Sequence, residues 1–313
     1  MTVSSDLALI ESRIADAVDR FMALDADDTI EGPCLTISRE VARQALVSSE
    51  GGKRLRALLA LHAFDATDPQ GHDDDDAHAR GRDAVLDLAC AIEVFQTAAL
   101  VHDDIIDDSD LRRGKPAAHK ALGTTSHSAS LGRGLGIMLG DLLATASVDI
   151  AHAAAQRMPR PDMIVSTFLR MHREVEIGQV LDLAAEEETP DAEHIYTLQD
   201  LKTGALIRAA CCCGVVAGHG SAAQYEAAAR YATALGLAFQ IRDDMLDVLG
   251  DTKTLGKAVH VDEKKGTFVR LYGLERCGEM IAAEGEKAEA ALEVFEDPAF
   301  LKELVQKLAV REF

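Results

Sequence analysis

The sequence predicts an all-α fold organised as a single domain. Alanine is abundant and proline is scarce, with 7 prolines in 313 residues, which favours helix over sheet. Apolar residues recur at helical spacing in one segment after another, and no segment alternates apolar and polar residues as a half-buried strand would. Because no linker separates regions of different composition, we predict one domain over residues 1–313.

Apolar periodicity and chain breakers define the expected helices in order. The first covers residues 6–24, and a Gly-Pro break at 32–33 precedes a second helix that starts after Ser38 as its N-cap. Residues 109–135 contain several glycines and are expected to form a loop. The other helical patterns cover 51–64, 83–108, 136–158, 161–186, 191–216, 221–250 and 274–295.

One polar stretch, residues 65–83, contains proline, glycine and four consecutive aspartates. Such a run could bind a cation, but a solvated loop is the interpretation that we favour.

The charge balance excludes one class of partner. Lys and Arg number 32 against 53 Asp and Glu, so the formal net charge is −21 and nucleic acid would be repelled. The six cysteines show no metal-binding spacing and are interpreted as reduced thiols, which predicts a cytoplasmic protein. The N-terminal segment 1–21 is acidic and has no apolar core run, so we expect neither a signal peptide nor a transmembrane segment.

Two aspartate clusters share one spacing: DDIID at 103–107 and DDMLD at 243–247. On a helix of about 3.6 residues per turn, the first and last aspartates of each cluster point the same way. One such cluster is usually an exposed acidic face, but both of these follow apolar segments that should be buried. Buried carboxylates need cations, and Mg²⁺ takes oxygen ligands. Two such helices could therefore clamp a metal-bound diphosphate.

Basic residues stand beside these clusters and beside glycine turns. Any one of them alone would be interpreted as a surface charge, but together they favour binding of two anionic groups, because arginine and lysine both bind phosphate. They are Arg112 and Arg113 after the first cluster, Lys53, Arg54 and Arg56 in GGKRLR, Lys202 in LKTG, Lys257 in GDTKTLGK and Lys265 in KKGT.

The order of these motifs resembles the trans-isoprenyl diphosphate synthases of the polyprenyl synthase family, and among them the geranylgeranyl diphosphate synthases. The matching pieces between residues 51 and 267 are GGKRLR, LVHDDIIDDSDLRRGKP, LGD, LKTG, FQIRDDMLD, GDTKTLGK and KKGT. The resemblance implies an antiparallel helical bundle around a deep central cavity, assembled as a homodimer. Two departures, Ala57 where the family often has proline and Phe268-Val269 after Thr267, remove no ligand.

The resemblance also implies roles for individual residues. The direct Mg²⁺ ligands would be Asp103, Asp107 and Asp243, and each active site would hold three ions. Asp104 and Asp247 would contribute through water or from outside the direct ligands. The allylic diphosphate would be held by Arg112, Lys202, Lys257 and Lys265, and isopentenyl diphosphate by Lys53, Arg56, Gln96 and Arg113. Lys202, Thr203 and Gln240 would lie near the developing allylic cation.

The implied reaction is a head-to-tail (1'-4) condensation. Metal ions draw electrons from the allylic diphosphate, an allylic carbocation forms, and the double bond of isopentenyl diphosphate attacks it. An apolar cavity would keep water from the cation.

Small residues before the first cluster bear on product length. Ala98 and Ala99 stand where bulky residues in this family stop the chain at C15. Phe95 would lie roughly 12 Å below the metals at about 1.5 Å per residue, and is either the floor that stops the chain at C20 or a core residue. We expect geranylgeranyl diphosphate as product, with farnesyl or longer diphosphates as alternatives. A class I terpene cyclase and a non-catalytic regulatory subunit are further alternatives, although both usually lack one of the two clusters.

Overall fold

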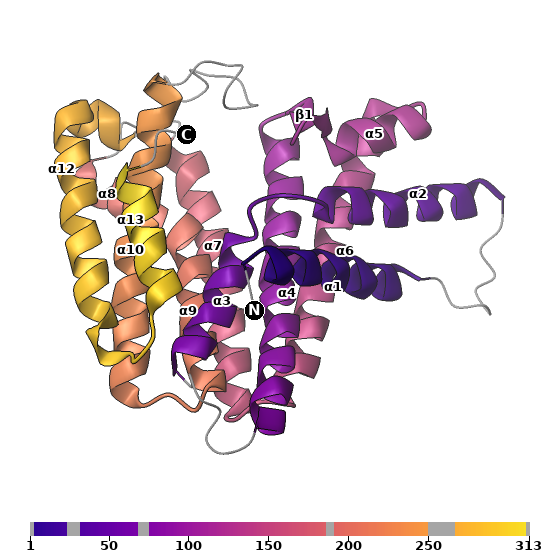
Figure 1. Ribbon diagram of the computed structural model, residues 1–313. Helices are drawn as coiled ribbons and strands as arrows, with labels where there is room; N and C mark the ends of the chain where they lie inside the picture. Colours follow the sequence, from indigo (N-terminus) through magenta and orange to yellow (C-terminus); the bar gives the residue numbers. More distant parts are fainter. Residues whose placement is uncertain (1–2, 24–31, 68–74, 186–190, 250–266, 311–313) are drawn as a thin grey trace. The chain divides into compact units, whose positions relative to one another are not determined.

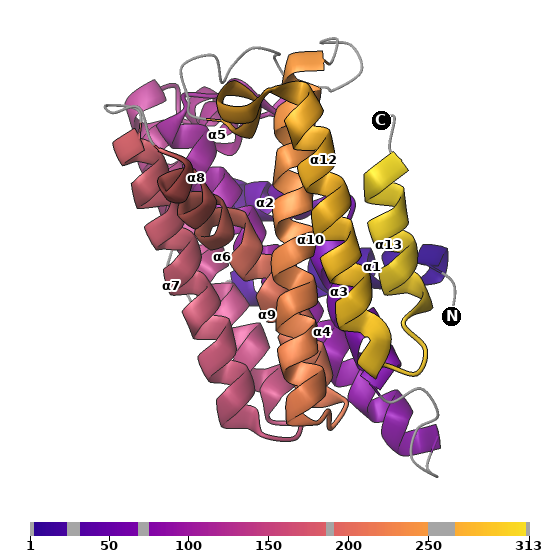
Figure 2. The same cartoon turned by 90° about the vertical axis from the view of Figure 1, so that its left-hand side faces the viewer.

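The computed structural model describes residues 3–23, 32–67, 75–185, 191–249 and 267–310, and nearly all of them are helical (Figures 1 and 2). The all-α prediction is therefore confirmed. The helices are α1 (Val3–Met22), α2 (Gly32–Ser49), α3 (Leu55–Thr67), α4 (Asp75–Ile106), α5 (Ala118–Thr125), α6 (Ala129–Ala155), α7 (Pro161–Ala185), α8 (Ala192–Gln199), α9 (Ala205–Ala217), α10 (Ala222–Leu249), α12 (Phe268–Ala291) and α13 (Ala299–Val310).

Shorter elements join the helices. A two-stranded antiparallel hairpin, β1 (Leu111–Arg112) and β2 (Lys115–Pro116), follows α4. A π-helical turn, Asp200–Gly204, lies between α8 and α9, and a 3₁₀ turn, Leu292–Val294, follows α12.

The chain forms two compact units. Unit 1 contains Met1–Leu58 and Leu86–Gln156, and unit 2 contains Leu59–Val85 and Arg157–Phe313. The boundaries fall inside α3 and α4, so each of these helices contributes residues to both units. The first aspartate cluster belongs to unit 1 and the second to unit 2. The assignment of one domain to residues 1–313 stays a prediction.

Glycines on one face of α6 let its neighbours in unit 1 approach closely. A Cβ on Gly132 would lie 2.4 Å from the Cα of Gly123 in α5, and one on Gly140 would lie 2.2 Å from Nε2 of His102 in α4. Any larger residue at these positions would force the helices apart. α6 therefore packs on α5, and it also contacts α1 and α2.

α10 is the central helix of unit 2, and it lies beside α12 in both views (Figures 1 and 2). The buried Tyr231 on α10 donates its hydroxyl proton to the backbone oxygen of Leu301 in α13, over 3.0 Å. α9 packs against the same helix with almost every side chain buried, including three consecutive cysteines. Burial raises the pKa of the Cys212 thiol to about 11, and all six cysteines are free, as predicted.

Several local predictions were wrong at helix boundaries. The second helix begins at Gly32, so Ser38 lies inside it and is not its N-cap. The GGKR segment is not helical, because Gly51, Gly52 and Arg54 have φ of 72°, 100° and 49°, outside the helical region. The fourth helix begins at Asp75, before residue 83.

The segment predicted as a loop, 109–135, is mostly ordered secondary structure. It holds the β hairpin, α5 and the first turn of α6. Ser128 is the N-cap of α6, and its side chain accepts a hydrogen bond from the backbone N–H of Leu131, over 3.2 Å. This capping signal was present in the sequence but was obscured by the surrounding glycines. α13 was not predicted.

Within the residues that the structure describes, two helical stretches are long and apolar enough, by length and composition alone, to cross a membrane. The first, Asp76–Ile106, has 78% of its most apolar window buried, as a core helix has. The second, Ala129–Ala155, has 39% of that window buried. The sequence prediction of no transmembrane segment stays a prediction.

Candidate active site

The first aspartate cluster lies at the C-terminal end of α4, in unit 1. The backbone N–H of Asp107 donates to the oxygen of Asp103 over 2.9 Å, so these two residues are one helical turn apart, as predicted. The Asp103 side chain is 21% exposed and Asp107 is exposed, whereas Asp104 is only 3% exposed. The cluster therefore offers two accessible carboxylates and buries the third.

Asp104 is paired with Arg112 of the hairpin. Arg112 donates from Nε to Oδ1 of Asp104 over 2.9 Å, and its Nη2 donates to the same oxygen. Burial alone would lower the pKa of Arg112, but this hydrogen bond and the charges of Asp104, Asp103 and Asp107 raise it. The guanidinium therefore stays charged beside the accessible carboxylates.

The hairpin turn separates Arg112 from Arg113. Its two central residues, Arg113 and Gly114, have φ of 52° and 75°, as a type I′ turn requires. Arg113 donates from Nη1 to the backbone oxygens of Glu50 and Gly51, over 2.7 and 3.0 Å. Burial and the positive charge of Arg54 lower the pKa of Arg113. Adjacent arginines thus reach different parts of unit 1.

The GGKR loop is held by Arg54, a residue to which the sequence analysis gave no separate role. Arg54 is 2% exposed, and its Nε and Nη2 donate to the two carboxylate oxygens of Glu11, each over 2.8 Å. Its Nη2 also donates to the backbone oxygen of Ser49, and its Nη1 lies 3.5 Å from Oε2 of Glu93. Glu93 in turn accepts a hydrogen bond from the N–H of Ala57, over 3.1 Å.

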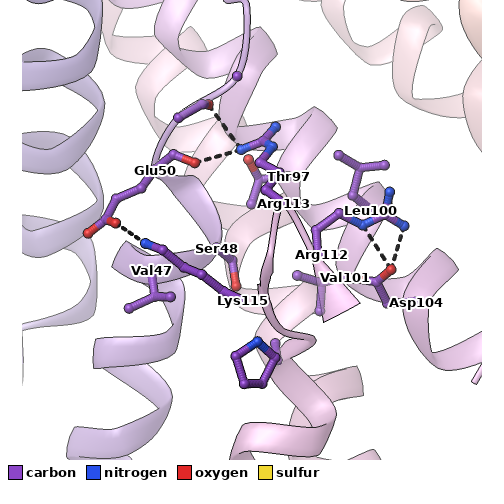
Figure 3. Close-up of a pocket in the computed structure, with 14 residues that line it drawn as sticks. Val47, Ser48, Glu50, Thr97, Leu100, Val101, Asp104, Arg112, Arg113 and Lys115 are labelled. Atoms are coloured by element: carbon purple, nitrogen blue, oxygen red, sulfur yellow. Dashed lines mark hydrogen bonds and ion pairs between the residues drawn. The ribbon is translucent and has the colours of Figure 1, made fainter. Parts of the chain in front are cut away.

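These contacts tie the loop to α1, α2 and α4. Gly51 and Gly52 of the loop line a pocket of about 370 Å³ (Figure 3). Arg112, Arg113 and Lys115 bring positive charge to its lining, and Asp104 and Glu50 bring negative charge. A Cβ on Gly52 would lie 3.1 Å from Nη2 of Arg113, so glycine is needed where the loop meets this side chain.

One of the predicted isopentenyl diphosphate ligands lines this pocket, and the others are close in sequence to residues of the loop or of the lining. Arg113 lines the pocket. In the chain, Lys53 directly follows the lining residue Gly52, and Gln96 directly precedes the lining residue Thr97. Arg56 stands in the first turn of α3, next to Ala57.

The second aspartate cluster lies near the C-terminal end of α10, in unit 2. Asp244 is 8% exposed and accepts two hydrogen bonds, from Nε2 of Gln240 over 3.0 Å and from the backbone N–H of Phe268 over 2.8 Å. Phe268 is the first residue of α12, so this carboxylate joins two helices. Asp243 and Asp247 are partly exposed.

Three other predicted residues meet around the π-helical turn of unit 2. Thr203 donates its hydroxyl proton to Oε1 of Gln240, over 3.4 Å. Nζ of Lys202 lies 2.6 Å from a carboxylate oxygen of Asp182 in α7. A Cβ on Gly178 of α7 would lie 2.5 Å from the backbone nitrogen of Lys202, so the two segments approach closely only because of glycine. The sequence pattern predicted an uninterrupted helix here and missed the π turn, an element that is frequent at functional sites.

The remaining predicted residues are distributed as follows. Phe95 and Ala98 on α4 are each 1% exposed, and Ala99 is partly exposed. Lys257 and Lys265 lie outside the described residues.

Each cluster is compatible with a divalent metal by its donor set. Among the described residues, no group of three or more His, Cys, Asp or Glu side chains is assembled for a metal ion. Mg²⁺ does not require one, because it is usually held by one or two carboxylates together with water and substrate phosphates. Asp103 with Asp107, and Asp243 with Asp247, are accessible pairs of this kind.

Comparisons with known proteins agree with this chemistry. The family model described as "Polyprenyl synthetase" matches residues 39–307. The chain is 33% identical over 312 residues to geranylgeranyl pyrophosphate synthase 3, chloroplastic, of Arabidopsis thaliana, covering 96% of this chain and 79% of that one.

Two solved structures share the fold. A polyprenyl synthase from Caulobacter crescentus CB15, complexed with calcium and isoprenyl diphosphate, matches with a TM-score of 0.76 and 27% identity, covering 99% of this chain and 96% of that one. A geranylgeranyl pyrophosphate synthase from Corynebacterium glutamicum matches with a TM-score of 0.82 and 24% identity, covering 100% of both chains.

Proposed function

The chain belongs to the polyprenyl synthetase family and is a prenyltransferase, and we propose that it condenses isopentenyl diphosphate with an allylic diphosphate to give geranylgeranyl diphosphate. The observation that carries the proposal is that the Arg112 guanidinium lies 3.7 Å from the accessible Asp103 carboxylate, while Arg113, next to it in the chain, lines the same pocket as Arg112. A site with both charges suits a diphosphate held partly by metal and partly by guanidinium groups. The C20 product is supported by the curated relative named above.

Divalent metal belongs to this proposal. Asp103, Asp107 and Asp243 would be direct ligands. Asp104 and Asp247 would contribute through water or by holding the side chains around the metals, and we expect three Mg²⁺ ions per active site. The metal would supply Lewis acidity that weakens the bond between the allylic carbon and its diphosphate. The support is the accessible carboxylate pair in each cluster and the calcium complex of the Caulobacter relative.

We propose that the basic residues form two sets, each of which binds one of the two diphosphate groups. Arg112, Lys202, Lys257 and Lys265 are proposed for the allylic diphosphate, and Lys53, Arg56, Gln96 and Arg113 for isopentenyl diphosphate. Within the described chain, Arg113 uses only Nη1 for the Glu50 and Gly51 oxygens, which leaves Nε and Nη2 as donors for phosphate.

Residues of unit 2 would stabilise the reacting centre. Thr203 and Gln240 share a hydrogen bond, which fixes the orientation of both dipoles, and Lys202 stands next to Thr203. We propose that these oxygens face the developing allylic cation. The proton lost from the condensed product would leave with the released diphosphate.

A homodimer is the proposed assembly, supported by the exposed face of α6. Leu131, Met138 and Leu142 follow one another at helical spacing and are 44%, 52% and 39% exposed. A second copy covering this stripe would remove it from water. Met138→Lys should shift the mass measured by light scattering from dimer to monomer. A monomeric unmodified chain, or one that sediments with lipid vesicles, would contradict the dimer.

A cytoplasmic location is also proposed, because all six cysteines are free.

Product analysis tests the function. The purified chain is incubated with Mg²⁺, isopentenyl diphosphate and farnesyl diphosphate, and the dephosphorylated alcohols are sized. A single C20 alcohol is expected, and Phe95→Ala should lengthen it if Phe95 stops the growing chain. Products from the allylic substrate alone would indicate a terpene cyclase, and no product with any allylic starter would indicate a non-catalytic subunit.

A further inference from the structure

A second pocket of about 290 Å³ lies in unit 1, at α5 and the beginning of α6. It shares no lining residue with the pocket of Figure 3. Its charged and polar lining consists of Asp108, His119, Lys120, Thr124, His127 and Arg133. None of these residues has a role in the proposed condensation.

Two cations of this pocket converge on one carboxylate. Nζ of Lys120 and Nη2 of Arg133 each lie 3.0 Å from Oδ1 of Asp108. The Asp108 side chain is 57% exposed, so its carboxylate reaches Lys120 and Arg133 from the solvent side.

A buried imidazole lies beside this carboxylate without a hydrogen bond. His119 is 3% exposed, and neither of its ring nitrogens has a hydrogen-bond partner in the described part of the chain. Its nearest charged neighbour is Oδ1 of Asp108, 3.8 Å from Nε2. Burying a polar group without a partner is unfavourable, so this ring is a poor choice for a purely structural role.

The first turn of α6 adds backbone donors. Ser128 caps the helix and satisfies the N–H of Leu131, while Ala129, which begins the helix, lines the pocket. The remaining N–H groups of a first turn have no acceptor within the helix, and the helix dipole places about half a positive charge there. Such an end favours an anion.

We propose that this pocket binds a phosphate or diphosphate ion, which takes the place of the Asp108 carboxylate between Lys120 and Arg133 and accepts a hydrogen bond from His119. Displacing Asp108 costs little, because solvent screens exposed ion pairs and they contribute little to stability. A phosphate brings up to two negative charges and several acceptor oxygens where the carboxylate brings one charge. The net charge of −21 opposes binding only weakly, because charges beyond about 8 Å are screened at physiological salt.

Calorimetric titration of the full-length chain with sodium phosphate, in EDTA and without prenyl substrates, tests the site. Asp108→Asn removes the carboxylate that Lys120 and Arg133 share, although Asp110 still lies 3.0 Å from Lys120, and it should tighten phosphate binding by about fivefold to tenfold. Lys120→Met and Arg133→Met should each weaken it by a similar factor. Lys287→Met, on an exposed lysine of α12 that pairs with Glu284, should leave it unchanged.

A second experiment tests where phosphate binds, independently of how tightly it binds. The ¹⁵N shifts of the His119 ring should move on titration in the unmodified chain and stay fixed in Lys120→Met. Arg113→Met is the control for phosphate that binds in the pocket of Figure 3. In a chain that carries Arg113→Met, the substitution Asp108→Asn should still tighten phosphate binding. If Asp108→Asn weakens binding or leaves it unchanged, or if the effect disappears with Arg113, the proposal is wrong.

Discussion

The two aspartate clusters have the same spacing, but they bury their second carboxylate in different ways. In unit 1, Asp104 is buried against a charged partner, Arg112, which donates twice to a single carboxylate oxygen. In unit 2, the buried Asp244 accepts hydrogen bonds from two neutral donors, the side-chain amide of Gln240 and the backbone N–H of Phe268, one on each carboxylate oxygen. In both clusters the first and last aspartates remain accessible.

The difference shows that one motif combines two tasks. The accessible aspartates are the ones available to metal, whereas the buried one anchors the helix to its surroundings. In unit 1 the anchor attaches the hairpin that carries Arg112 and Arg113. In unit 2 it attaches the start of α12. The predictions below test this separation of tasks.

The largest effect should come from the accessible positions. Asp103→Asn and Asp243→Asn should each lower kcat for condensation by about a thousandfold, equivalent to about 4 kcal/mol, because each removes a proposed metal ligand. Steady-state assays with farnesyl and isopentenyl diphosphate measure this. Because neither side chain is buried, the unfolding midpoint should hardly change.

Asp149→Asn, on an exposed position of α6, is the matched control and should retain full activity. If the kcat of Asp243→Asn stays within fivefold of the kcat of the unmodified chain, the two clusters do not have equivalent roles in metal binding.

The next effect concerns the charged network around the first cluster. Arg54→Met should lower the free energy of unfolding in urea by about 3 kcal/mol, because it leaves Glu93 buried without its cation. Arg43→Met, which breaks an exposed pair with Glu40, should cost less than about 1 kcal/mol. If both variants lose the same free energy of unfolding, the buried network is no more stabilising than an exposed ion pair.

A direct comparison of the anchors should show a smaller effect. Asp244→Asn should lower the free energy of unfolding by about 2 kcal/mol, because an amide offers one acceptor oxygen to two donors. Asp104→Asn should cost less than about 1 kcal/mol, because its one accepting oxygen is kept and Arg112 is partly exposed. Urea unfolding of both variants measures the difference, and the reverse order would contradict the geometry.

The smallest effect is a dependence on pH in unit 2. Burial lowers the pKa of His172 to about 4, below the usual value of 6.5. The unfolded chain therefore binds more protons than the folded chain between these values, and stability falls as pH falls through this window. From pH 7.5 to pH 5.5 this group should remove about 1 kcal/mol.

His172→Gln should flatten that part of the pH profile, measured by urea unfolding at each pH. His152→Gln, at an exposed residue of α6, is the control and should leave the slope unchanged. An unaltered slope in His172→Gln would assign the acid sensitivity to other groups.

Local sequence rules accounted for much of the fold. Helical periodicity located the cores of most helices, and the spacing of Asp103 and Asp107 placed both on one face of α4. The rules failed where backbone conformation departs from helix for a tertiary reason. Arg54 has a positive φ although the sequence around it favours helix, and the contacts of its buried guanidinium hold it there.

The sequence by itself determined the class of chemistry, because carboxylates at helical spacing and arginines at a turn have only a few uses. Tertiary structure decided which carboxylate is available. Asp104 and Asp244 stand at equivalent positions in their motifs, and nothing in either motif reveals that one meets a guanidinium and the other a helix start. Those partners are 8 and 24 residues away in the chain. Only folding brings them into contact. The spacing of side chains along a helix depends on neighbouring residues alone, whereas the burial of a side chain depends on residues that are distant in the sequence.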